Sequence, residues 1–231
     1  MHSKAIHPAG RDLLILEHVA RHRLTTNEVV RRVVVPGLSR NATAKLLTRL
    51  CSGDYLARYV LLHPQCYYTL GRVAAQQLGL SSHRCEALGP QALPTEFALL
   101  VHANLGQQHR LRLLNHEVRA RYPWLPPLLA KAPHCLLPAD EALELVRVDL
   151  GGSADHLARK CVHDLDERLK LPALAQQLQR GLFRMAIVTG TRPKAAAIRD
   201  ALDRQGLSQR LLMHFTVTSD LFTLLGAHTR A

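Results

Sequence analysis

Apolar residues recur at helical spacing near the start of the chain and predict three short helices. The first covers residues 12–23, and the second runs from Asn27 to about Val34. The third covers Ser39–Ser52, with Ser39 as its N-cap, because the hydroxyl can accept a hydrogen bond from a free amide of the first turn. The Pro36-Gly37 turn before it favours a helix-turn-helix. Helical periodicity gives the third helix an apolar stripe made of Thr43, Leu46, Leu47 and Leu50.

The opposite face of the predicted Ser39–Ser52 helix has cations, an amide and hydroxyl groups but no acid. This face carries Asn41, Ala44, Lys45 and Thr48, and it is flanked by Arg40 and Arg49. In a DNA major groove, arginine reads guanine, asparagine reads adenine and lysine contacts phosphate. We interpret this face as a candidate for reading duplex DNA. On this stretch alone, an ordinary solvated helix face is the alternative.

Two β-rich runs after the third helix predict a hairpin. They cover residues 55–61 and 66–70, with a proline-containing turn between them and a short helix after them. A hairpin directly after a helix-turn-helix is the wing of a winged-helix domain, which we expect over residues 1–80. In the wing, Arg58 and His63 are candidates for phosphate contacts, and ordinary strand-surface residues are the alternative. A minority of winged helices bind only proteins.

The charge balance favours a polyanionic partner. Thirty Lys and Arg residues against 18 Asp and Glu residues give a net charge of +12. A field of one sign and this size most often serves nucleic acid, and an anionic membrane surface is the other option. The basic excess is denser in residues 1–80, where the candidate reading helix lies.

The second half of the chain predicts a mixed sheet with helices on it. Residues 81–94 lack periodicity and contain Gly and Pro, so we take them as a linker to a domain at 95–231. The domain begins with a helix over 95–122 that pauses near Gly106. Strands are expected at 134–138, 142–150, 183–188 and 211–217, and helices at 154–179 and 193–205. This succession predicts an α/β layer architecture.

Two acids at predicted strand ends raise an enzymatic alternative. Asp140 ends the first strand of this domain, Asp149 ends the second, and Lys160 lies about two turns into the next helix. Carboxylates at adjacent strand ends can hold Mg²⁺, and a nearby lysine can stabilise phosphoryl charge during phosphodiester cleavage. Acids at strand ends are common without any such role.

Other site classes have little support in the sequence. The five cysteines have no CxxC spacing, which argues against a zinc site and against a disulfide framework. The fourteen histidines are scattered and form no HExxH pair, so we expect no metal and no cofactor. No apolar run approaches the ~20 residues of a membrane span, and the N-terminus lacks a secretion signal. We therefore expect a cytoplasmic protein with reduced thiols.

Several motifs together resemble the replication-relaxation family of mobile genetic elements, which includes the MobC-type plasmid mobilisation proteins. They are 67–71 (Tyr-Tyr-Thr-Leu-Gly), 101–105 (Val-His-Ala-Asn-Leu), Pro138-Ala139-Asp140, 146–151 (Val-Arg-Val-Asp-Leu-Gly), Lys160, and the segment starting Met185-Ala-Ile-Val-Thr189. The resemblance implies a second domain like the PD-(D/E)xK nucleases, and some members of the family act as relaxases that nick plasmid DNA. It also implies that Asp140, Asp149 and Lys160 match the nuclease pattern.

One position departs from that family. Its second strand usually reads Glu-x-Asp-Arg-Gly-Thr, and Arg147 stands here in place of the metal-binding glutamate. A guanidinium repels Mg²⁺ because arginine does not deprotonate. The resemblance therefore implies a degenerate nuclease-like domain that has lost cleavage and serves in dimerisation or DNA clamping.

These observations lead to one expectation with two alternatives. We expect a winged helix-turn-helix followed by a restriction-endonuclease-like α/β domain. The protein is expected to be a homodimeric, sequence-specific double-stranded DNA-binding protein of a mobile element. It would be a transcriptional regulator or a non-cleaving accessory at a transfer origin. The first alternative is a Mg²⁺-dependent nickase that uses Asp140, Asp149 and Lys160. The second is a protein–protein module built on the winged helix.

Overall fold

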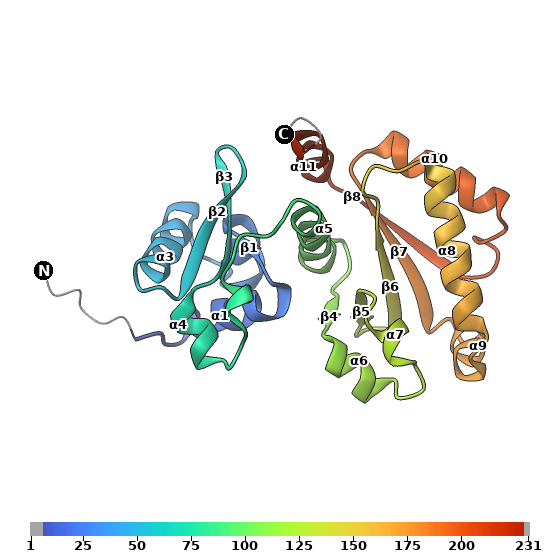
Figure 1. Ribbon diagram of the computed structural model, residues 1–231, viewed down its shortest axis with the longest axis horizontal. Helices are drawn as coiled ribbons and strands as arrows, with labels where there is room; N and C mark the ends of the chain where they lie inside the picture. The colour runs from blue at the N-terminus through green and yellow to red at the C-terminus, as the bar shows by residue number, and fades with distance from the viewer. Residues whose placement is uncertain (1–6, 229–231) are drawn as a thin grey trace, which may run out of the picture. The chain divides into compact units, whose positions relative to one another are not determined.

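The computed structural model describes residues 7–228, and the chain divides into two compact units between Leu100 and Val101. Figure 1 shows the elements of both units. Residues 1–6, which belong to the stretch expected to lack a secretion signal, lie outside the described part. Within the predicted linker at 81–94, a 3₁₀ turn covers Ser82–Arg84, and the helix α5 already begins at Ala92.

The first unit combines short helices with a three-stranded antiparallel sheet. Its main elements are α1 (Arg11–His22), β1 (Thr25–Thr26), α2 (Asn27–Val29), the π-helical turn η1 (Val30–Val34), α3 (Arg40–Ser52), β2 (Leu56–Leu62), β3 (Gln65–Leu70) and α4 (Arg72–Gln77). The strand order is β1-β3-β2, so β3 lies in the middle. The predicted third helix and hairpin are therefore present.

The start of α3 follows from its sequence. The Ser39 hydroxyl accepts a hydrogen bond from the backbone N–H of Ala42 at 3.2 Å, which confirms the predicted cap. Leu47 and Leu50 are fully buried, as the apolar stripe predicts. They join a core cluster shared with α1 and the hairpin that includes Ile15, Leu16, Val19, Leu56, Tyr68 and Leu70.

The second predicted helix is only partly α-helical. After Val29 the chain widens into η1, where the Val35 N–H donates to the Val30 carbonyl, five residues back, at 2.9 Å. The stretch is dense in valine, whose branched Cβ crowds the preceding turn and lowers α-helix propensity. The short α2 keeps the side-chain cap of Thr26, which accepts from the Val29 N–H at 3.3 Å.

The second unit is built around a five-stranded mixed sheet. Its elements are α5 (Ala92–Leu105, which starts in the first unit), β4 (Leu111–Leu113), α6 (Asn115–Arg121), α7 (Pro127–Ala130), β5 (His134–Leu137), β6 (Ala142–Val148), α8 (Ala154–Leu169), α9 (Pro172–Gln179), β7 (Phe183–Thr189), α10 (Arg192–Arg204), β8 (Leu212–Val217) and α11 (Ser219–His228). The strands lie in sequence order. β4, β5 and β6 run antiparallel, and β6, β7 and β8 run parallel. The described part of the chain is therefore a mixed α/β structure.

Two predicted helices are wrong in their extent. The helix expected over 95–122 is interrupted by β4, which pairs with β5 through contacts that the local pattern does not reveal. Gly106 lies at the break, where an added Cβ would come within 2.9 Å of the His102 carbonyl oxygen. The helix expected over 154–179 ends at Leu169, and α9 starts at Pro172, because a proline disfavours helical backbone at the residue before it.

The two faces of this sheet differ in character. One face forms an apolar core with α8 and α10, which lie on the same side of the sheet in Figure 1. Its side chains include Leu136, Leu143, Leu145, Phe183, Met185 and Ile187. The strand registers put a polar set on the opposite face, since alternate residues of a strand point to opposite sides. This polar face carries Arg112, Cys135, Glu144, Arg184, His214 and Thr216.

Candidate functional site

The exposed face of α3 is the candidate nucleic-acid interface. Arg40, Asn41, Lys45 and Thr48 are all exposed on this helix. The helix contains no acidic residue, and within residues 7–228 neither Arg40 nor Lys45 pairs with a carboxylate. Asn41, Lys45 and Thr48 are spaced four and three residues apart, so they follow one line along the helix surface. These groups are free to meet phosphates and base edges.

Arg49 differs from its neighbours on α3. Its guanidinium forms an ion pair with Asp12 of α1, whose carboxylate is almost fully buried. Arg49 therefore joins α3 to α1, and half of its side chain remains exposed. Arg49 was predicted to read bases, and in the structure it also holds two helices together.

The two wing residues occupy separate positions on the hairpin. Arg58 of β2 is exposed, and its Nε donates to Cys66 Sγ across the hairpin at 3.2 Å. His63 is exposed in the turn between β2 and β3. A phosphate contact is sterically open to both residues.

The structure does not bring the predicted Mg²⁺ set together. Asp140 lies in the turn before β6, whereas Asp149 lies just after β6. A seven-residue strand separates them, which spans roughly 23 Å. The two carboxylates cannot hold one ion across that distance, and the exposed Lys160 of α8 cannot complete such a site. The sequence placed both acids at strand ends correctly, but these are opposite ends of one strand.

Each of these acids has a partner of its own. Asp140 pairs with Arg184 at 2.7 Å, while Asp149 accepts hydrogen bonds from the Thr189 hydroxyl at 2.8 Å and from the Gly151 N–H at 3.1 Å. Arg147, at the position where the resemblance implies a metal-binding glutamate, forms an ion pair with Asp164 of α8. These partners give all three side chains structural contacts, although the buried Nε of Arg147 has no hydrogen-bond partner.

A buried polar cluster on the polar face is the second candidate site, and sequence reasoning missed it. His102 of α5 places Nε2 at 2.7 Å from Glu144 Oε2 and Nδ1 at 2.8 Å from Thr216 Oγ1. Arg110 Nε donates to the same Glu144 oxygen at 2.8 Å. Cys135 is the direct cross-strand partner of Glu144. The available signal was a single acid, Glu144, within the otherwise apolar first half of β6.

The electrostatics of this cluster follow from burial and charge. Burial opposes ionisation of Glu144, but the hydrogen bonds and charges of His102 and Arg110 outweigh it and hold the pKa of this carboxyl below its ordinary value. Burial raises the pKa of the Cys135 thiol to about 12, so this cysteine is protonated at neutral pH. Burial also lowers the pKa of His214, with Arg110 adding to the effect.

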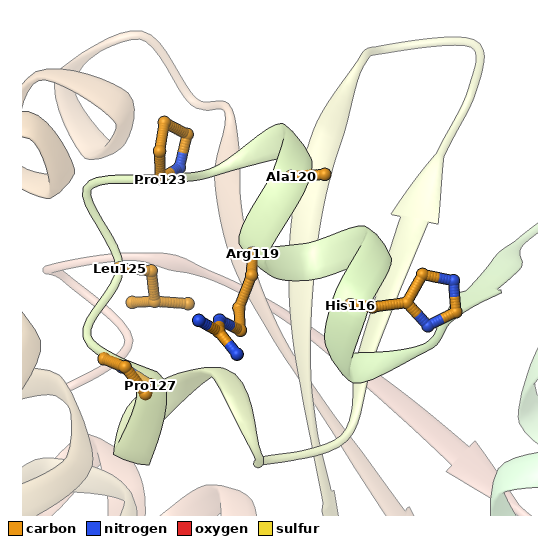
Figure 2. A pocket seen from close by; sticks show the side chains of 6 residues that line it. All are labelled: His116, Arg119, Ala120, Pro123, Leu125 and Pro127. Atoms are coloured by element: carbon orange, nitrogen blue, oxygen red, sulfur yellow. The ribbon is translucent and has the colours of Figure 1, made fainter.

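A surface hollow beside α6 offers less chemistry. Figure 2 shows the six residues that line it, with the Arg119 side chain reaching across the loop that follows α6. The hollow has a volume of about 400 Å³, and prolines contribute to its wall. Its lining includes neither a carboxylate nor a nucleophile, so it lacks the paired groups that acid–base or covalent catalysis needs.

Comparisons with known proteins assign no family and no function to this chain. No family model matches the chain, and neither a curated protein nor a solved structure matches it significantly. The structure also contains no helix that is both long enough and apolar enough to cross a membrane among the residues it describes.

Proposed function

We propose that the first unit is a winged helix-turn-helix that binds double-stranded DNA in a sequence-specific manner through α3. The observation that carries this proposal is the exposed, acid-free face of α3 with Arg40, Asn41, Lys45 and Thr48. Such a helix fits the major groove, where its first residues meet base edges and its lysine meets the backbone.

The order of elements supports this reading of the first unit. Three helical segments precede a two-stranded hairpin, and a short strand between α1 and α2 pairs with β3. In this arrangement α3 would be the recognition helix and the β2–β3 hairpin the wing. Arg58 and His63 then lie where a wing contacts phosphates. The net charge of +12 supplies the sequence-independent part of the affinity.

For the second unit we propose a restriction-endonuclease-like fold that does not cleave DNA. The helix α5 precedes three antiparallel strands, with α6 and α7 inserted between β4 and β5. The helices α8 and α9 then lead to β7, and β7 and β8 extend the mixed sheet in parallel, which supports this assignment. The separation of Asp140 from Asp149 argues against Mg²⁺-dependent cleavage at those residues. The protein would then act as a regulator or a transfer-origin accessory of a mobile element.

Selection of bound duplexes from a random pool tests the proposal directly. The full chain, at about physiological salt, is expected to enrich a defined motif. Arg40→Ala and Asn41→Ala are expected to relax base preference by about 1–3 kcal/mol at single positions. Arg72→Ala is the matched control, because it removes an exposed arginine that lies outside α3. Base reading by α3 would be refuted if the wild type recovered no motif. It would also be refuted if Arg40→Ala, Asn41→Ala and Arg72→Ala all showed the same base preference.

The same selection addresses a proposed homodimer. A palindromic motif would support it, because the symmetry of the site mirrors that of the protein and the half-site spacing reports its geometry. Sedimentation of the free protein gives an independent answer. Particles of only 25.7 kDa, the mass of one chain, would argue against the dimer.

A further inference from the structure

We infer that His102, Cys135 and Glu144 form a binding site for a zinc-type transition-metal ion inside the second unit. One ligand atom from each residue lies within 4.8 Å of the other two. All three side chains are buried, with exposed fractions of 0 %, 1 % and 1 %. This site is separate from the DNA-binding face of α3 and does not depend on that function.

The donor set selects the class of metal. A thiolate and an imidazole are ligands that Zn²⁺ and similar ions prefer, and a carboxylate completes a common three-residue set. Mg²⁺ prefers oxygen ligands, so this site differs in kind from the one expected at Asp140 and Asp149. Three protein ligands leave a fourth tetrahedral position for a solvent molecule.

The backbone holds these donors in fixed places. Cys135 and Glu144 are opposite each other in the antiparallel β5–β6 pair, so their side chains leave the same face of the sheet as neighbours. His102 comes from α5 and reaches the same point. The residues are far apart in sequence, and only the folded unit assembles them.

The surrounding side chains hold the ligands in position by hydrogen bonds. Thr216 Oγ1 holds His102 Nδ1 at 2.8 Å and so directs Nε2 toward Glu144. Arg110 Nε donates a hydrogen bond to Glu144 Oε2 at 2.8 Å. A hydrogen bond to the far nitrogen of a ligating histidine, and one to a ligating carboxylate, are common features of metal sites.

One buried atom supports the site independently. Glu144 Oε1 has no hydrogen-bond partner, although the side chain is 1 % exposed and its other oxygen has two. An unsatisfied buried carboxylate oxygen is costly, and a cation at this point removes the cost. Glu144 can thus bind a metal through Oε1 while Arg110 keeps Oε2.

Metal binding requires a change in the protonation of Cys135 and of His102. Cys135 must lose its thiol proton to solvent, because the thiolate is the ligand. His102 must present a lone pair at Nε2, so a neutral ring gives up the Nε2 proton that faces Glu144 Oε2 in the metal-free protein and takes up one on Nδ1, which is donated to Thr216 Oγ1. The Cys135 thiolate and the Glu144 carboxylate offset the two charges of the metal, and the Arg110 guanidinium leaves the occupied cluster with one net positive charge. One proton is released for each ion bound.

Cobalt substitution of the full chain tests the site. The protein is stripped with a chelator, titrated with Co²⁺ and then challenged with Zn²⁺. We expect one equivalent of Co²⁺ with a thiolate-to-cobalt charge-transfer band, which Zn²⁺ then bleaches. Bound Zn²⁺ should also raise the thermal midpoint of the wild type, since a ligand that binds only the folded state stabilises it.

The variants identify the thiol. Cys135→Ser should remove the charge-transfer band, and Glu144→Gln should weaken Co²⁺ binding at least tenfold. Cys161→Ser is the matched control and should keep the band. Cys161 is another fully buried thiol, whose pKa burial raises to about 12, but it lies on α8 in the apolar core.

Three outcomes would overturn the inference. These are a wild-type protein without the band, a band that survives in Cys135→Ser, and stoichiometric Zn²⁺ that all variants bind equally through surface histidines. The wild-type spectrum decides the question even if a variant does not fold. Duplex selection repeated with chelator present reports DNA binding separately, so failure of one proposal is distinguishable from failure of the other.

Discussion

Arg49 of α3 pairs with Asp12 of α1, a carboxylate whose side chain is only 6 % exposed. The pair joins the candidate recognition helix to the first helix of the unit. Without Arg49, Asp12 would keep the Ala9 N–H as a hydrogen-bond donor at 3.3 Å but would lose its paired cation, which is costly for a buried charge. Arg49 differs in this respect from Arg40, which forms no ion pair with a carboxylate within residues 7–228.

We expect Arg49→Ala to lower the free energy of unfolding by about 1.5 kcal/mol, because a charge-assisted hydrogen bond is lost and Asp12 stays buried. Arg40→Ala should change it by less than about 0.5 kcal/mol, as is usual at exposed positions. Urea denaturation of both variants measures the difference. Equal effects would show that the pair contributes nothing to stability.

Lys45 is expected to contact phosphate and not bases. Lys45→Ala should weaken DNA binding about equally for all sequences and reduce the slope of log K against log salt by about 1. Binding titrations at several salt concentrations, on the selected motif and on a scrambled duplex, measure this. A loss confined to the selected motif would instead assign Lys45 to base reading.

Asp164 lies between two arginines of the second unit. It pairs with Arg147 of β6, and it lies 3.7 Å from Arg168, whose side chain is 1 % exposed. Burial lowers the pKa of Arg168 to about 10, which shows how unfavourable its site is for charge. Asp164→Asn should therefore cost about 3 kcal/mol of stability, since it leaves a buried cation without its carboxylate.

The matched control for Asp164 is Asp166, two residues along the same helix. Asp166 pairs with Arg210 at 2.5 Å, and both side chains are more than one-third exposed. Asp166→Asn should change stability by less than about 1 kcal/mol, as exposed ion pairs do. If both variants lose the same stability in chemical denaturation, burial of Arg168 is not the cause.

His18 of α1 should make the first unit sensitive to acid. Burial lowers the pKa of His18 from 6.5 to about 4 in the folded state. Between these two values the unfolded chain binds a proton that the folded chain does not, so stability falls as the pH drops from 6.5 toward 4. His18→Gln should show a smaller fall in thermal midpoint between pH 7 and pH 5. An unchanged pH profile in the variant would contradict this assignment.

We expect no nicking of supercoiled plasmid in the presence of Mg²⁺ or Mn²⁺. The reason is geometric, since Asp140 and Asp149 lie at opposite ends of β6. Gel analysis of plasmid topology measures this over a range of protein concentrations. Nicking by the wild type that Asp140→Ala abolishes would restore the enzymatic alternative.

Local patterns predicted individual elements well where a single helix or hairpin decides them. The Ser39 cap, the buried Leu47 and Leu50, and the β2–β3 hairpin all depend on residues near one another in sequence. The predictions were wrong where distant residues decide. β4 is too short to show a periodicity, and it exists because β5 pairs with it.

The candidate sites divide in the same way. Helical periodicity alone grouped Arg40, Asn41, Lys45 and Thr48, because residues on one helix face follow from a fixed turn angle. The same reasoning could not detect that Arg49 meets Asp12 across two helices. It also put Asp140 and Asp149 into one site, because strand ends are visible in sequence but strand direction is not.

The sequence by itself determined the face of α3, the charge excess and the approximate boundaries of the longer strands, because periodicity, net charge and turn residues are local properties. Only the tertiary structure decided which side chains meet on the sheet. Cysteine and histidine spacing argued against a metal site, yet His102, Cys135 and Glu144 converge within 4.8 Å. Strand register and the placement of α5 bring them together, and both depend on pairing between segments that no local pattern encodes.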